Sequence, residues 1–255
     1  MILGAQMYTV REFTKTPEAL SQTLKKIADI GYKTVQVSGT CEYDPEWLSE
    51  ELKKNGLECV ITHYPSDKIK EAPEETVKAH KIFGCHRIGI GSMPGGIAQT
   101  LSEYEKFRED YLPAAKRIKD AGGYLMYHNH SGEFCRLENG KTVLENMLED
   151  FSADILGITL DTYWVQSGGG DVIWWLKNLS GRVPCIHLKD MGIENTWDQK
   201  MRAVGEGNMN FPGIIKAAEE AGTEYLLVEQ DDCGKDDPFD CLKRSYQYLG
   251  SLGLK

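Results

Sequence analysis

The stretch YLMYHNHSGEF (124–134) places four residues that favour β-strands directly before two histidines and a glutamate. The same order, a short apolar run that ends in ionisable side chains, recurs in LGITLD (156–161), VPCIHLK (183–189) and YLLVEQD (225–231). In a parallel α/β barrel, the functional residues lie at the carboxyl ends of the strands. The recurrence therefore predicts parallel strands whose ends gather polar side chains on one rim.

Short strand-like runs alternate with longer amphipathic segments along the whole chain. The predicted strands are 2–8, 33–38, 57–63, 87–91, 124–130, 156–161, 183–189 and 225–231. The predicted helices are 17–31, 44–56, 73–84, 101–122, 141–150, 171–181, 211–222 and 238–253. This alternation predicts the α/β class and one domain over 1–255, a single (β/α)8 TIM barrel. A doubly wound open sheet is the alternative, but YTVREFTKTP (8–17) stands where its glycine-rich phosphate turn would be.

Proline and glycine mark the predicted helix ends. Prolines 17, 45 and 73 stand where a first helical turn tolerates proline, and glycines 31, 56, 84, 122 and 222 follow the last apolar residue of a helix. His80 lies inside a predicted helix, and we expect it at the surface.

Composition and charge narrow the function classes. The 255 residues carry 41% hydrophobic and 27% charged side chains, and the formal net charge is -10. A negative surface repels nucleic acid and anionic membranes, so neither is expected as a partner, whereas a small carbohydrate is compatible with it. The seven scattered cysteines form no C-x-x-C pair, which favours reduced thiols. No leader-like or membrane-spanning stretch stands out, so we expect a cytoplasmic enzyme.

Ionisable residues end five of the predicted strands, including four in succession. They are His63, His128, His130, Glu133, Asp161, His187, Lys189 and Glu229. Glu133, Asp161, His187 and Glu229 form a candidate set of three carboxylates and one imidazole for one divalent cation. Mn²⁺ or Mg²⁺ suits such oxygen-rich ligation, and Co²⁺ or Zn²⁺ suits a more open site.

The other rim residues are candidates for catalysis and substrate binding. His128, His130 and Lys189 are left over for proton abstraction beside a carbonyl, with Glu229 as a further catalytic group. The substrate-binding candidates are His63, Tyr8, Trp164 and Glu206. Taken singly, His63 is as compatible with a packing role as with a functional one, and the aromatic residues could simply close the barrel mouth.

The chain resembles the xylose isomerase-like barrels of the sugar phosphate isomerase/epimerase family. The resemblance rests on GAQMYTVR, YHNHSGEF, LDTYWV, IHLKD, AVGEGNMNFPGI and LLVEQD, which occur in this order across nearly the whole chain. It implies a Glu, Asp, His, Glu metal set, matched by Asp161, His187 and Glu229. Where the epimerases have a glutamate at the end of strand five, this chain has His128-Asn129-His130. Either Glu133 reaches back to the metal, or a histidine replaces the glutamate.

The resemblance implies an isomerase or epimerase that abstracts a proton next to a carbonyl of a sugar. The altered strand-five end makes a metal-dependent lyase the alternative, either a dehydratase or an enzyme that cleaves 3-oxo-glycosides. Abasic-site endonucleases share the barrel, but that role needs more histidine ligands and a basic face. A non-catalytic sugar-binding barrel is a further alternative, and a homo-oligomer is compatible with the sequence.

Overall fold

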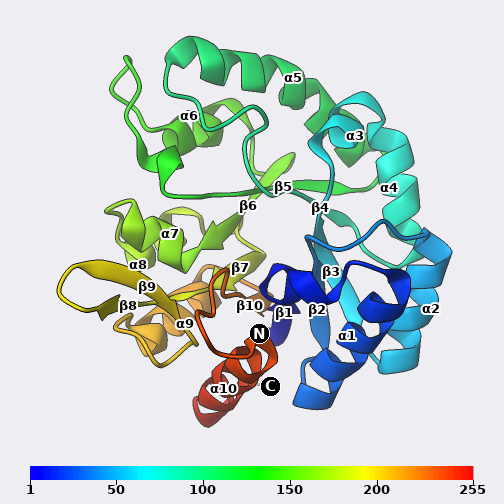
Figure 1. The fold of residues 1–255 in the computed structure, drawn as a ribbon. Coiled ribbons are helices and arrows are strands. Elements are labelled where there is room, and N and C mark those ends of the chain that lie inside the picture. Colours follow the sequence, from blue (N-terminus) through cyan, green and yellow to red (C-terminus); the bar gives the residue numbers. More distant parts are fainter. Residues whose placement is uncertain (255) are drawn as a thin grey trace.

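Eight parallel strands close into a barrel, and helices surround it on the outside (Figure 1). The computed structural model describes residues 1–254. Around the barrel the strands follow the order β1-β10-β7-β6-β5-β4-β3-β2, so consecutive barrel strands are neighbours. Their bounds are β1 Ile2–Gln6, β2 Thr34–Val37, β3 Glu58–His63, β4 Arg87–Ile90, β5 Tyr124–His128, β6 Leu156–Asp161, β7 Cys185–Leu188 and β10 Tyr225–Val228. The predicted TIM barrel is confirmed.

Ten α-helices occupy the segments between and after the strands. They are α1 Pro17–Ile30, α2 Pro45–Asn55, α3 Ser66–Glu71, α4 Pro73–Ile82, α5 Leu101–Asp120, α6 Val143–Asp150, α7 Thr162–Ser167, α8 Val172–Asn178, α9 Phe211–Glu220 and α10 Pro238–Ser251. Helices α1, α2 and α4 begin with the predicted prolines. Gly31 and Gly56 follow α1 and α2 with φ values of 126° and 62°, which a residue with a side chain rarely adopts. None of these helices is long and apolar enough to cross a membrane.

The barrel interior is filled with side chains, so the fold leaves the site to the rim. Val60, Ile61, Met126, Cys185 and Leu227 form a buried cluster of their own. Alternate residues of a strand point to opposite faces, and the remaining core fills the layer between the strands and the helices. With the interior packed, the side chains at the carboxyl ends of the strands are the ones expected to form the functional site.

The structure adds elements that the sequence did not predict. After β7 the chain forms an antiparallel hairpin of β8 (Asp190–Glu194) and β9 (Asp198–Arg202). Short 3-10 helices, η1 (Met7–Phe13) and η2 (Gly132–Phe134), follow β1 and β5, so both strands end earlier than expected. The hairpin was missed because its residues are mostly polar and exposed, which gives no alternating apolar pattern.

The expectation of a surface position for His80 was wrong. Its ring is fully buried, with Nδ1 2.7 Å from the carbonyl oxygen of Thr76 and Nε2 2.8 Å from Oγ1 of Thr62. His80 belongs to α4 and lies on its buried side, where both ring nitrogens have hydrogen-bond partners. The helical pattern alone does not reveal that a polar residue can be buried in this way.

Candidate metal centre and active site

Four donor side chains meet at the carboxyl rim of the barrel. His128 ends β5, Asp161 ends β6, His187 lies in β7, and Glu229 directly follows β10. One donor atom from each lies within 4.8 Å of those of the other three, and all four residues are buried. Because these strands are neighbours in the barrel, residues from distant parts of the chain converge on one small volume.

The two histidines are held so that one ring nitrogen of each faces the cluster. Nδ1 of His128 lies 2.9 Å from the carbonyl oxygen of Gly91, and Nε2 of His187 lies 2.6 Å from Oε1 of Gln36. Since both oxygens can only accept, these outer nitrogens carry the proton in the neutral rings. The inner nitrogens also face carboxylate oxygens, with Nε2 of His128 3.1 Å from Oδ2 of Asp161 and Nδ1 of His187 2.8 Å from Oε2 of Glu229. Each inner nitrogen can therefore carry a second proton or, once that proton is lost, bind a cation.

The two carboxylates are held in the same way. Oδ1 of Asp161 accepts a hydrogen bond from the backbone N–H of Trp164 at 3.0 Å, and Oε1 of Glu229 accepts one from Nε2 of Gln6 at 2.6 Å. Their other oxygens face the histidines. Nδ1 of His187 and Oε2 of Glu229 have no hydrogen-bond partner within residues 1–254, although the two atoms are 2.8 Å apart. The Lys189 ammonium group lies 2.9 Å from Oε2 of Glu229 and offsets part of the carboxylate charge. Two carboxylates and two imidazoles that converge on one buried point also fit a metal ion.

Lys189 supplies positive charge beside the same oxygens. Its Nζ lies 2.9 Å from Oε2 of Glu229, 3.1 Å from Oδ2 of Asp161 and 2.8 Å from Oδ2 of Asp231. Burial opposes the charge of this amine, but the three carboxylates outweigh burial and raise its pKa above the ordinary value. The ammonium group is therefore an integral part of the charge balance at the rim.

Glu133, the expected fourth ligand, makes other contacts. Its Oε1 accepts a hydrogen bond from the hydroxyl of Tyr127 at 2.6 Å, and its Oε2 accepts one from the backbone N–H of His130 at 2.9 Å. Burial raises the pKa of this carboxyl group. The structure thus brings Asp161, His187 and Glu229 together as expected, with His128 in the place foreseen for Glu133.

A cavity of about 390 Å³ lies beside the cluster and is lined by two of its donors, His128 and Glu229. We call it the metal-side cavity. Its lining includes the candidates Tyr8, His63, His128, His130, Lys189 and Glu229. Nδ1 of His130 and Nε2 of His63 are buried and have no protein partner among the described residues. Burial, together with His128, lowers the pKa of His130 to about 3 and that of His63 well below its ordinary value, so both rings are neutral near pH 7.

Two predicted substrate-binding residues lie elsewhere. Trp164 packs against His130, with ring centroids 5.4 Å apart, and does not line the metal-side cavity. Glu206 pairs with Arg244 at 2.6 Å and lines a different surface cavity. Nearby, Asp190 accepts hydrogen bonds from backbone N–H groups of the same loop, including that of Gly207 at 2.8 Å. The structure does not bring Glu206 to the metal-side cavity.

Gln6, Gln36 and Arg11 escaped the sequence-based list. Gln6 ends β1 and Gln36 lies in β2, so the strand-end rule that found the four donors applies to them as well. Amides do not stand out as ligands, which is why they were passed over. Nothing in the sequence pattern marks Arg11, whose guanidinium donates to the carbonyl oxygen of Asp231 at 3.0 Å.

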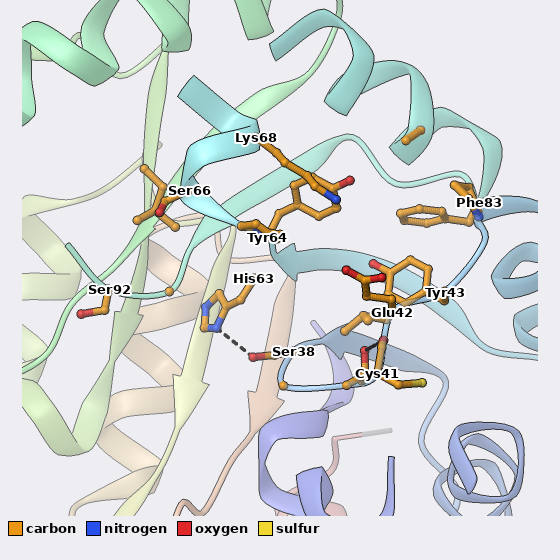
Figure 2. Close-up of a pocket in the computed structure, with 18 residues that line it drawn as sticks. Ser38, Cys41, Glu42, Tyr43, His63, Tyr64, Ser66, Lys68, Phe83 and Ser92 are labelled. Atoms are coloured by element: carbon orange, nitrogen blue, oxygen red, sulfur yellow. Dashed lines mark hydrogen bonds between the residues drawn. The ribbon is translucent and has the colours of Figure 1, made fainter. Parts of the chain in front are cut away.

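A second cavity adjoins the first, between the loops that follow β2, β3 and β4 (Figure 2). Its volume is about 550 Å³, and Tyr43, Tyr64 and Phe83 contribute aromatic rings to its walls. We call it the aromatic cavity. His63 lines both cavities and is joined to Ser38 by a hydrogen bond of 3.0 Å between Nδ1 and Oγ.

A closed parallel barrel with a His/Asp/His/Glu cluster on its carboxyl rim defines a TIM barrel with a possible metal site. The chain belongs to the xylose isomerase-like TIM barrel family, whose family model matches residues 24–249. It is 23% identical to an inosose dehydratase from Mesomycoplasma hyopneumoniae over 269 residues, which cover 92% of this chain and 89% of that protein.

Solved structures share the fold. A sugar phosphate isomerase/epimerase from Parabacteroides distasonis superimposes with a TM-score of 0.82 at 24% identity, covering 97% of this chain and 92% of that one. An L-ribulose 3-epimerase superimposes with a TM-score of 0.76 at 16% identity, covering 99% and 94%. Proteins named as dehydratases and as epimerases therefore share this barrel fold.

Proposed function

We propose that the protein is a metal-dependent lyase that acts on an oxidised sugar or cyclitol. The supporting observation is the make-up of the cluster, which has one glutamate, Glu229, and places His128 where a second carboxylate was expected. An epimerisation that uses two glutamates needs one on each face of the carbon. An elimination needs only one base, because the proton that leaves carbon can be returned to the departing oxygen.

His128, Asp161, His187 and Glu229 would hold one divalent cation. When bound, the cation would polarise the carbonyl of the substrate and stabilise negative charge on its oxygen. We propose Mn²⁺, and a donor set with two imidazoles and two carboxylates also suits Co²⁺ or Zn²⁺.

We propose His130 as the base. Its unpartnered Nδ1 is buried at the metal-side cavity, and its ring centroid lies 4.7 Å from that of His128. In the proposed step, His130 takes the proton from the carbon next to the carbonyl. The C–H electron pair becomes a C=C bond, and the β C–O bond breaks. The departing oxygen takes its proton back from the imidazolium, so that charge and protons balance.

His63 and Lys189 would orient the substrate. Nδ1 of His63 is fixed by Ser38, which leaves Nε2 directed at the ligand. Lys189 is held by Asp161, Glu229 and Asp231, so its ammonium group is positioned without needing the substrate.

The test is turnover in D₂O by protein loaded with Mn²⁺, using inosose and 3-oxo-glucosides and following the products by NMR. A lyase releases the β-substituent and forms an unsaturated ketone. His130→Gln should slow this by about 10²–10⁴-fold, while bound metal is unchanged. His63→Gln should mainly raise KM. Release of no substituent from any of these ketones, with turnover of other sugars, would refute the lyase.

An isomerase or epimerase is the second candidate. Glu229 lies directly after β10 and supplies a carboxylate to the cluster, and the L-ribulose 3-epimerase shares the fold. The same experiment identifies this outcome, because an epimerase incorporates deuterium next to the carbonyl and keeps the β-substituent.

A further inference from the structure

We propose that the aromatic cavity binds a second, flat aromatic ring of the substrate, so that the natural substrate is an aryl glycoside rather than a free monosaccharide. The inference rests on the proposed function, because it takes the sugar ring to react in the metal-side cavity. It concerns a part of the molecule that the proposed reaction does not use.

The two cavities lie side by side and share part of their lining. The five residues that line both are Ser38, Gly39, His63, Gly91 and Ser92. None of the four cluster residues lines the aromatic cavity. A ligand that fills both therefore places one part beside the cluster and another past His63, between the loops that follow β2 and β3 (Figure 2).

The volumes indicate a ligand with two parts. The metal-side cavity measures about 390 Å³ and the aromatic cavity about 550 Å³. Cavities of roughly 300–1,000 Å³ bind drug-sized molecules. A single sugar would occupy the smaller cavity and leave the larger one filled with water, so the larger cavity has room for a substituent of at least comparable size.

The walls of the larger cavity favour a flat ring. Tyr43 and Phe83 meet edge to face, with ring centroids 6.3 Å apart and planes at 81°. Tyr64 leans on His80 in the same manner, at 4.8 Å and 72°, so its ring is braced from behind. Aromatic rings prefer edge-to-face and offset contacts of this kind, and a third ring entering between them would extend the arrangement.

The polar groups of this cavity suit hydroxyl groups on that ring. Tyr43 and Tyr64 both line the cavity and carry phenolic hydroxyls that can donate and accept hydrogen bonds. One cation, Lys68, lies 5.9 Å from the centre of the Tyr64 ring, and the lining also includes one carboxylate, Glu42. With one charge of each sign, the cavity does not favour a strongly anionic group such as phosphate, and the chemistry points to a phenolic aglycone.

The test compares the affinities of unreactive probes for the intact protein loaded with Mn²⁺. Calorimetry would measure 4-nitrophenyl β-glucoside, methyl β-glucoside and cellobiose. We expect the aryl glucoside to bind about tenfold more tightly than the methyl glucoside, as an added aromatic contact implies. Tyr64→Ala should abolish this preference. Ser66→Trp should do the same by filling the cavity, and it removes no aromatic wall.

The control is Trp197→Ala, which removes a side chain that is 87% exposed on the β8–β9 hairpin and should leave the preference intact. Equal affinities of the aryl and methyl glucosides, or no binding of the aryl glucoside, would overturn the inference. Tighter binding of cellobiose would assign the cavity to a second sugar instead and overturn it too. The inference is supported if Tyr64→Ala and Ser66→Trp both lose the preference for the aryl glucoside while their unfolding temperature and metal content stay unchanged.

The two proposals fail separately. His187→Asn should lose the metal and all turnover but keep the preference for the aryl group, because it does not touch the aromatic cavity. Aryl preference without elimination activity would refute the lyase alone. Elimination from 3-oxo-glucosides without aryl preference would refute the second-ring site alone.

Discussion

Nδ1 of His187 lies 2.8 Å from Oε2 of Glu229, and the two atoms do not form a hydrogen bond. His187 lies in β7 and Glu229 directly follows β10, and these two strands are neighbours in the barrel. Gln36 engages the other nitrogen of His187 and Gln6 the other oxygen of Glu229, so in the neutral ring the facing atoms are two acceptors. Burial opposes a second proton on the ring, but Glu229 and Asp161 raise the pKa of His187. Either a proton or a metal cation must therefore lie between the two atoms, and the first two predictions concern the metal.

The first prediction distinguishes the two candidates for the fourth ligand. His128→Asn should lower the affinity for Mn²⁺ by at least about tenfold, because it removes a donor from the cluster. Glu133→Gln is the matched comparison and should keep the metal, since this carboxylate contacts Tyr127 and the backbone of His130. Elemental analysis after dialysis measures both. Metal lost from Glu133→Gln but retained in His128→Asn would restore the glutamate as the ligand.

The second prediction concerns the amide that orients His187. Gln36→Leu should weaken Mn²⁺ binding by about 10–100-fold, because residues that fix a ligating histidine usually contribute this much. Gln166→Leu on the exposed side of α7 is the control and should change nothing. Calorimetric titration with Mn²⁺ measures the effect. An affinity equal to that of the parent would show that Gln36 does not orient the ring.

The third prediction concerns the charge of Lys189. In metal-free protein, Lys189→Met leaves Asp161 and Glu229 buried without their cation and should cost about 3–5 kcal/mol in the free energy of unfolding. That corresponds to a fall of roughly 10 °C in Tm. Mn²⁺ should restore much of the loss, because it neutralises the same oxygens.

Thermal unfolding with and without Mn²⁺ measures this difference. The exposed Lys216→Met on α9 is the control, since its ammonium group contacts only Glu220 at 3.9 Å. A Tm of metal-free Lys189→Met equal to that of the parent would contradict the charge balance inferred here.

The fourth prediction is a pH dependence from His80. Burial lowers its pKa from 6.5 to about 4. Between these values the unfolded chain binds a proton that the folded protein does not, so stability falls as the pH drops from 6.5 to 4. His80 thereby lowers the free energy of unfolding by about 3 kcal/mol over this window. This loss is absent above pH 6.5 and complete below pH 4.

His80→Leu removes the titrating group and should flatten the loss of stability between pH 6.5 and 4, even if it is less stable than the parent at pH 7.5. Urea unfolding at a series of pH values measures the slope. The cluster histidines contribute to both proteins equally, so the difference in slope isolates His80. Identical slopes would show that this ring does not titrate as its burial implies.

Much of the barrel and its rim could be predicted from the sequence. A parallel strand has a two-residue period and a defined carboxyl end. These two features restrict where an ionisable residue at that end can lie and in which direction its side chain can point. This is why Asp161, His187 and Glu229 were found together, although the chain separates the first from the last by 68 residues. The same rule placed His63 and His130 at the metal-side cavity.

The choice between His128 and Glu133 depended on tertiary structure. Strand alternation holds only as far as His128, where β5 ends, and beyond it the chain turns into η2. The direction of Glu133 then depends on its bonds to the Tyr127 hydroxyl and to the turn, which no periodicity encodes.

The partners of Lys189 and the shape of the two cavities likewise arise only in the folded chain. The sequence placed this lysine at a strand end, but its contacts with Asp161, Glu229 and Asp231 join strands that are far apart in sequence. The aromatic cavity is lined by three loops and by residues of α2, α3 and α4, so its walls exist only once the barrel has closed. The sequence determined which residues reach the rim because strand geometry is local. Which of them meet there was decided by packing between distant segments.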